Sequence, residues 1–273
     1  MRIIWQGLKV TFGFFLVAGL VFASSVFAVL LYGKATGNYP VVFANGPVMR
    51  EAAKAAAGTI AAPTPISLPV QSRQTSAMLD APAIRQFPEL PAGCEITTLT
   101  MLLQFKGIQK GKMELVEEMP RDNTPIKLNA DGTPAYWGNP NIGFVGDVTR
   151  KGRGFGIYHA GLFPLLKSYV PTAIDVTGES FEMYEDQVAS GIPVMVWTTI
   201  DYNMPYKWVT WDTPVGPIQT SFSEHAVLLV GFDEENVYVN DPYNGKKQFQ
   251  VNKAQFIQSW EAMGKQGLTY LNK

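Results

Sequence analysis

Residues 224–241 read EHAVLLVGFDEENVYVND, and this stretch decides the fold class. The apolar run at 226–232 predicts a buried strand, residues 233–236 are typical of a turn, and residues 237–239 resume a strand. Two strands joined by so short a connection pair in antiparallel fashion. The stretch therefore predicts an antiparallel hairpin.

Further strands and helices are predicted on both sides of this hairpin. Short runs of strand-forming residues lie at 192–197 (IPVMVW) and 248–251 (QFQV). Helices are predicted at residues 94–106, 160–169, 179–190 and 253–263. Helices that precede an antiparallel sheet indicate an α+β fold, with the N-terminal helices packed on the sheet.

Cys94 is the only cysteine of the chain, and it opens the predicted helix at 94–106. A helix N-terminus presents unpaired N–H groups and the positive end of the helix dipole, and both stabilise a thiolate. Cys94 is therefore a candidate nucleophile, and a buried structural cysteine is the alternative. Glu95 follows directly, and its charge would oppose thiolate formation if the side chain points inward.

A thiol nucleophile needs a base, and the chain has two histidines, His159 and His225. We favour His225, because it opens a predicted strand, whereas His159 precedes a helix, where capping or packing is the usual role. Asp241 lies sixteen residues after His225, one strand out and one strand back. It is the candidate that orients the imidazole. The alternative for Asp241 is a turn residue before Pro242.

Attack on a carbonyl also needs hydrogen-bond donors for the oxyanion, and the backbone N–H of Cys94 and the side-chain amide of Gln86 are candidates. The segment 201–211 (DYNMPYKWVTW) is aromatic and irregular. We interpret it as a lid or substrate-binding loop, with a packed surface insertion as the alternative. The candidate substrate-binding residues are Trp197, Trp208 and Trp211.

The composition limits the classes of partner and cofactor that the chain is expected to bind. A net charge of −1 gives no support for nucleic-acid binding, which favours a basic face. Two histidines and one cysteine form no clustered ligand set in the sequence, so neither a metal nor another cofactor is predicted. The sequence does not determine the oligomeric state.

The N-terminal part is predicted to be a transmembrane anchor or a cleaved signal segment. Residues 10–32 carry no charge, and 23 helical residues span roughly 34 Å, enough for a bilayer core. Arg2 and Lys9 precede the run, which favours an outward-facing C-terminal part. We therefore predict a transmembrane anchor or a cleaved signal segment at 1–33, an Ala/Pro/Thr-rich flexible linker at 34–81 and a globular domain at 82–273.

At the candidate site the sequence resembles the C39-like peptidase family, the papain-like "C39_2" domain of bacterial surface proteins. The resemblance covers residues 84–271. It is carried by RQFPELPAGCE (85–95), LTMLL (99–103), GFVG (143–146), GIPVMVW (191–197), EHAVLLVGF (224–232) and VNDP (239–242). It implies a papain-like cysteine peptidase fold, with Cys94, His225 and Asp241 as the triad and Gln86 at the oxyanion position. The chain differs from the peptidase domains of bacteriocin exporters, since it has no second cysteine near Cys94 and no ATPase domain.

Three functions follow from these observations. The first is a thiol hydrolase that cleaves a peptide or amide bond of a peptide or cell-surface substrate outside the membrane. The second is a surface binding module that keeps the fold but has little turnover. The third is a cell-wall amidase or transpeptidase, which differs only in the acyl donor and acceptor. An open groove beside Cys94, as opposed to a closed pocket, would help to discriminate among them.

Overall fold

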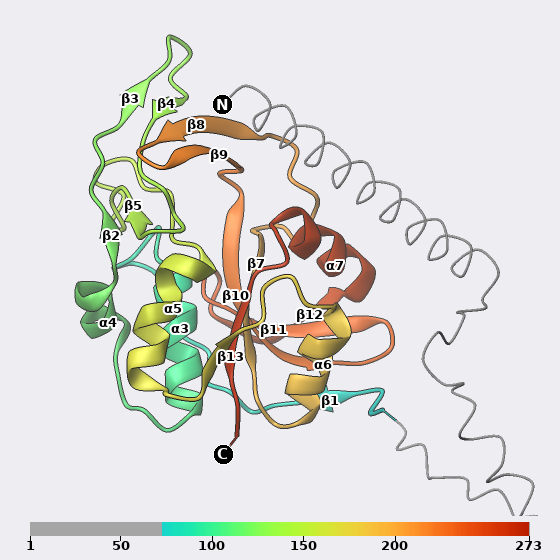
Figure 1. The fold of residues 1–273 in the computed structure, drawn as a ribbon. Helices are drawn as coiled ribbons and strands as arrows, with labels where there is room; N and C mark the ends of the chain where they lie inside the picture. The colour runs from blue at the N-terminus through green and yellow to red at the C-terminus, as the bar shows by residue number, and fades with distance from the viewer. Residues whose placement is uncertain (1–72, 273) are drawn as a thin grey trace, which may run out of the picture. The chain divides into compact units, whose positions relative to one another are not determined.

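The computed structural model describes residues 73–272, which form an α+β fold around one large sheet (Figure 1). The order of its strands is β12-β11-β10-β7-β13-β6, and β1 pairs with the end of β10. The strands are β1 (Ala77–Met78), β6 (Ala173–Asp175), β7 (Val194–Thr199), β10 (Glu224–Phe232), β11 (Asn236–Asp241), β12 (Lys246–Asn252) and β13 (Gly267–Tyr270). The pairing of β10 with β11 confirms the predicted hairpin.

Helices cover both faces of this sheet. They are α3 (Cys94–Phe105), α4 (Lys112–Glu118), α5 (His159–Tyr169), α6 (Phe181–Ala189) and α7 (Lys253–Ala262). Figure 1 shows α3 and α5 on one side of β10, and α6 and α7 on the other. Four of the five helices in the described part lie where the sequence predicts them, and the seven-residue α4 is not predicted.

The central strands alternate between two hydrophobic clusters, as side chains of a strand must. Ala226 and Leu228 face the cluster built by α3, α4 and α5, whereas Val227 and Leu229 face the cluster built by α6 and α7. Because both faces are covered, the strand has no solvent-facing positions. This explains why β10 is read in the sequence as an unbroken apolar run.

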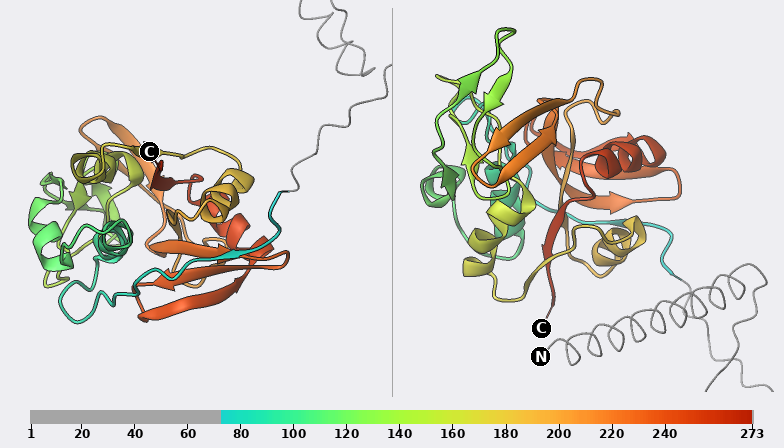
Figure 2. Two further views of the ribbon diagram at one scale, coloured as in Figure 1. Left: turned by 90° about the horizontal axis from the view of Figure 1, so that it is seen from below. Right: turned by 45° about the horizontal axis from the view of Figure 1, so that its top comes forward.

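Two smaller sheets flank the helical layer that contains α3. One is a parallel pair of β2 (Arg121–Asp122) and β5 (Phe144–Val145). The other has the order β3-β4-β8-β9, with β3 (Lys127–Leu128), β4 (Pro134–Tyr136), β8 (Val209–Thr213) and β9 (Gly216–Thr220). Figure 2 shows the β3–β4 hairpin projecting from this end of the domain. The segment 201–211 is therefore not irregular throughout, because its last three residues belong to β8.

The domain begins earlier than the predicted boundary at residue 82. β1 pairs with β10, Arg73 binds the side chains of Glu185 and Asp186 on α6, and Ala81 is completely buried. The predicted membrane segment at 1–33 lies outside the described residues. Within residues 73–272, no helix is both long and apolar enough to cross a membrane.

Candidate active site

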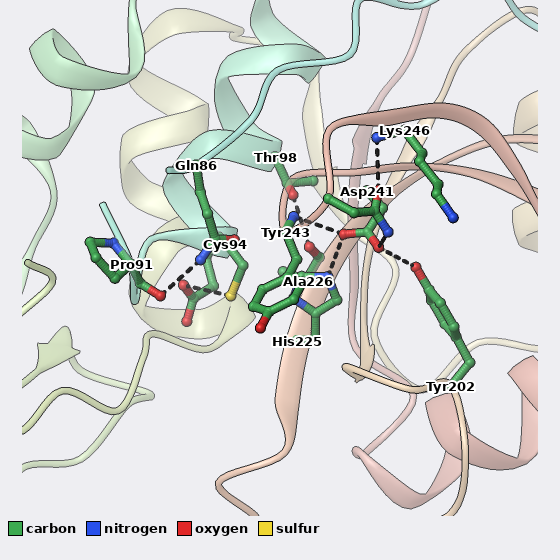
Figure 3. A network of polar contacts seen from close by, with 12 residues as sticks. Gln86, Pro91, Cys94, Thr98, Tyr202, His225, Ala226, Asp241, Tyr243 and Lys246 are labelled. Atoms are coloured by element: carbon green, nitrogen blue, oxygen red, sulfur yellow. Dashed lines mark hydrogen bonds and ion pairs between the residues drawn. The ribbon is translucent and has the colours of Figure 1, made fainter. Parts of the chain in front are cut away.

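Cys94 is the first residue of α3, as predicted, and this helix packs directly against β10. The Thr98 hydroxyl, one turn along the helix, donates to the Ala226 carbonyl at 3.0 Å. Gly93 precedes the cysteine, and a Cβ there would lie 2.6 Å from the Leu90 Cβ, so only glycine fits. The N-terminus of α3 is thereby fixed beside the start of β10, where His225 lies (Figure 3).

His225 and Asp241 form a buried pair across the hairpin. The His225 Nε2 lies 2.8 Å from the Asp241 Oδ1, and both side chains are 2% exposed. Strands β10 and β11 run antiparallel, which brings the start of one beside the end of the other. With Nε2 facing the carboxylate, Nδ1 is the ring nitrogen left for the thiol.

Asp241 is held as a carboxylate by further donors. The Tyr243 backbone N–H donates to Oδ1 at 2.8 Å, while the Tyr202 hydroxyl and the Asn244 amide donate to Oδ2 at 2.9 and 2.6 Å. Burial raises the pKa of Asp241, but the hydrogen bonds and the charge of His225 outweigh burial and lower it below the ordinary value. Tyr202 was not predicted, and nothing in the sequence distinguishes it from the other aromatic residues of its segment.

Gln86 lines the same pocket as Cys94. Its backbone N–H donates to the Pro242 carbonyl at 2.8 Å, and its Nε2 donates to the Pro91 carbonyl at 2.9 Å. A primary amide has two N–H groups, so one remains for a ligand. The Gln86 Oε1 is buried without a partner among the described residues.

Cys94, His225 and Gln86 line one small pocket of about 30 Å³. Beside it lies a groove of about 850 Å³, which the strand ends and loops at 131–134, 150–154 and 221–223 help to line. The residues that line both are Arg150, Gly154, Ile200 and Phe222. Cys94 therefore lies in a narrow recess at the edge of an open groove.

Glu95 points inward, which is the arrangement that opposes thiolate formation. It is completely buried, and the Cys94 thiol donates to its Oε2 at 3.3 Å. Burial raises the pKa of the Cys94 thiol well above its ordinary value, and the neighbouring Glu95 carboxylate raises it further. Glu224 was not predicted as a site residue, and nothing in the sequence distinguishes it from a solvated carboxyl at the start of a strand.

Comparisons with known proteins establish the family of this chain. A family model, the Peptidase_C39 like family, matches residues 78–268. The chain belongs to this family. The uncharacterized protein YvpB of Bacillus subtilis (strain 168) is 36% identical over 182 residues, which are 66% of this chain and 70% of YvpB. A crystal structure described as a candidate C39-like peptidase from Bacillus anthracis is 38% identical with a TM-score of 0.66, and the match covers 73% of this chain and 99% of that chain.

Membership of the C39-like family makes the chain a cysteine peptidase-like hydrolase with a papain-like α+β fold. Of the three tryptophans predicted to bind substrate, Trp197 and Trp211 are completely buried. Their indole N–H groups donate to the carbonyls of Ile157 and Gly138. Both therefore pack in the core and have no surface for a substrate, whereas Trp208 is 42% exposed and keeps its predicted role as a hypothesis.

The second histidine, His159, does not line the recess that contains Cys94. It opens α5 and pairs with Asp175 at 2.6 Å. Cys94, Glu95 and Glu224 bring one ligand-type atom each to within 4.8 Å of one another. The Cys94 thiol already donates to Glu95, and the charge of Arg150 lowers the pKa of both carboxyls.

Proposed function

We propose that this C39-like protein hydrolyses peptide bonds outside the membrane through Cys94, His225 and Asp241. The observation that carries the proposal is the buried His225–Asp241 pair, whose histidine lines the same recess as the single cysteine at the start of α3. A histidine that is oriented by a carboxylate and faces a thiol is the arrangement that activates a cysteine nucleophile.

In the proposed reaction, the His225 Nδ1 takes the Cys94 proton and the sulfur attacks the substrate carbonyl carbon. The Cys94 backbone N–H and the free N–H of Gln86 stabilise the oxyanion. The imidazolium then gives its proton to the leaving amine, which leaves a thioester on Cys94. Water, deprotonated by His225, hydrolyses this thioester and restores the thiol. Asp241 orients the imidazole and stabilises its charged form throughout.

The shape of the site favours an extended peptide as substrate. The recess itself holds little more than the reacting group, and the adjoining groove of about 850 Å³ can hold several side chains. Exposed apolar residues, Ile200 and Phe222, lie where the groove meets the recess. We propose the outer side of the membrane as its location because of the apolar segment 10–32 and the basic residues before it.

One observation favours a second candidate, a binding module with little turnover. The Cys94 thiol donates to Glu95. A thiol held in this way is a weaker nucleophile than an ion-paired thiolate. On that reading the groove would bind a peptide without cleaving it.

A peptide library separates the two candidates. The full chain, a Cys94→Ala variant and a His225→Ala variant are each incubated with a complex mixture of proteome-derived peptides, and new termini are identified by mass spectrometry. We expect new termini with the wild-type chain alone. If all three proteins give the same peptides while the wild-type chain still retains some of them on a column, the hydrolase proposal fails and the binding module replaces it.

A further inference from the structure

We propose that Glu95 and Glu224 form one carboxyl pair that holds Cys94 in the thiol form in the free protein, with the charge on Glu95 and the proton on Glu224. The inference deepens the proposed function by adding two residues that control the nucleophile. It rests on the packing around the two carboxyl groups.

Each carboxyl oxygen of Glu95 accepts a hydrogen bond. The Ile157 backbone N–H donates to Oε1 at 2.8 Å, and the Cys94 thiol donates to Oε2 at 3.3 Å. Two donors aimed at two oxygens favour a carboxylate, which accepts on both. The thiol hydrogen is therefore directed to Glu95 and away from the imidazole of His225.

Glu224 differs from Glu95 in its partners. Its Oε1 is buried and has no hydrogen-bond partner within the described residues. A buried carboxyl without donors is favoured in its neutral form, since an uncompensated charge is costly to bury. Both carboxyls abut Gly156, where a Cβ would lie 2.2 Å from the Glu95 Oε1 and 3.0 Å from the Glu224 Oε2. The backbone thus leaves room for the pair at this point.

The charged and titratable groups around the pair come from three elements. They are Cys94 on α3, His225 on β10, and Arg150 and Tyr158 on the segment between β5 and α5. Burial raises the pKa of Glu95 to about 7, against hydrogen bonds from its own backbone N–H, Ile157 and Cys94. Burial and the Glu95 charge raise the pKa of Glu224 well above its ordinary value, although Arg150 lowers it. Glu95 is therefore the more readily ionised of the two, and near neutral pH the pair carries at most one negative charge.

The consequence is a pH-dependent restraint on the thiol. While Glu95 is ionised, its charge beside the sulfur disfavours the thiolate. Removing that charge makes proton transfer from Cys94 to His225 easier. The pair itself neither gains nor loses a proton in the reaction, so it acts as a positioning and electrostatic element and not as a catalytic acid or base.

The test compares two isosteric variants of the full chain, Glu95→Gln and Glu224→Gln. The rate of Cys94 alkylation by iodoacetamide is measured between about pH 5 and pH 9, where only the thiolate reacts. We expect Glu95→Gln to move the rate profile down by at least about one pH unit, which is at least about tenfold faster alkylation near neutral pH. The glutamine keeps an oxygen for the Ile157 N–H.

Glu224→Gln is expected to behave differently, because it mimics the protonated state. Its rate profile should overlay that of the wild-type chain, because a protonated Glu224 carries no charge to remove and Glu95 keeps its own. A folded Glu95→Gln protein with an unchanged or slower profile overturns the proposal. Equal acceleration in both variants overturns it too, since the charge would then not reside on Glu95.

Infrared spectroscopy gives a second readout that needs no Glu95 variant. At about pH 8.5, above the Glu95 pKa of about 7, the wild-type chain should show a protonated carboxyl C=O band that is missing from Glu224→Gln, and a wild-type spectrum without this band contradicts the proposal. The peptidase proposal fails separately, if His225→Ala leaves peptide cleavage unchanged. In that case, faster alkylation of Cys94 in Glu95→Gln would still support the inference about the two carboxyls.

Discussion

Asp241→Asn is the substitution whose effect can be worked out most fully from the structure. The carboxylate is buried and accepts from four donors, two on each oxygen. An asparagine offers one oxygen, which can keep His225 and the Tyr243 N–H. Its NH₂ then faces the Tyr202 hydroxyl, which can turn to accept, and the Asn244 amide, which loses its acceptor. Hydrogen bonds to charged groups are worth about 1.5–3 kcal/mol each, so we expect a loss of about 3 kcal/mol of unfolding free energy.

The same change should lower activity without abolishing it. The retained oxygen still accepts from the His225 Nε2–H, so the ring keeps its orientation, but the charge that stabilises the imidazolium is gone. We expect kcat for a cleaved peptide to fall by about 10- to 100-fold, because the imidazolium that forms during the reaction no longer has a counter-charge. Urea denaturation and peptide cleavage measure the two effects.

A matched control is Asp80→Asn, at an exposed aspartate that pairs with Lys247. Exposed pairs contribute about 0–1 kcal/mol, so this variant should be close to the wild-type chain in both assays. If Asp241→Asn is as stable and as active as Asp80→Asn, then Asp241 is not the buried acceptor on which the proposed triad depends.

Three further predictions address neighbouring residues. The pKa of Glu95 is about 7 in the folded chain against an ordinary 4.5, so folding binds a proton there and stability falls as pH rises through this range. Between pH 5 and pH 8, the unfolding free energy of Glu95→Gln should fall by about 3 kcal/mol less than that of the wild-type chain. Gln86→Ala should lower kcat about 100-fold with KM nearly unchanged, because it removes an oxyanion donor; an unchanged kcat would remove Gln86 from the site. Gly156→Ala should cost about 1–3 kcal/mol in thermal or chemical unfolding, because its Cβ would lie 2.2 Å from a Glu95 oxygen; a neutral effect would mean that the carboxyls move aside freely.

The sequence predicts the centre of this fold well because the relevant signals are local. A strand that is buried on both faces must be apolar throughout, and residues 226–232 form such an apolar run. A helix that begins at Cys94 follows from the apolar face of the next twelve residues and from Gly107, which has a positive φ of 92° at the helix end. The strand-turn-strand spacing then brings His225 and Asp241 together without knowledge of the rest.

What the sequence does not predict depends on contacts between distant segments. Trp197 and Trp211 look like binding residues beside an irregular loop, yet both are buried in the cluster that α3 and α5 help to build, and their indole N–H groups donate to backbone carbonyls. The β8–β9 hairpin is not recognisable in the sequence, because Asn203 and Pro205 precede it and Pro214 and Pro217 lie within it. Glu224 and Tyr202 act through partners that are far away in the sequence, and only the packed structure shows that they reach Cys94 and Asp241.

The measurement that tests the central claim most directly is the alkylation rate of Cys94 in the wild-type chain and in His225→Ala. Because the chain has one cysteine, the incorporated label reports on Cys94 alone. If His225 is the base, its removal should slow alkylation at pH 7 by at least about tenfold, since the thiolate loses its counter-charge. Equal rates in the two folded proteins would mean that His225 does not act on the thiol, and the proposed catalytic site would be wrong.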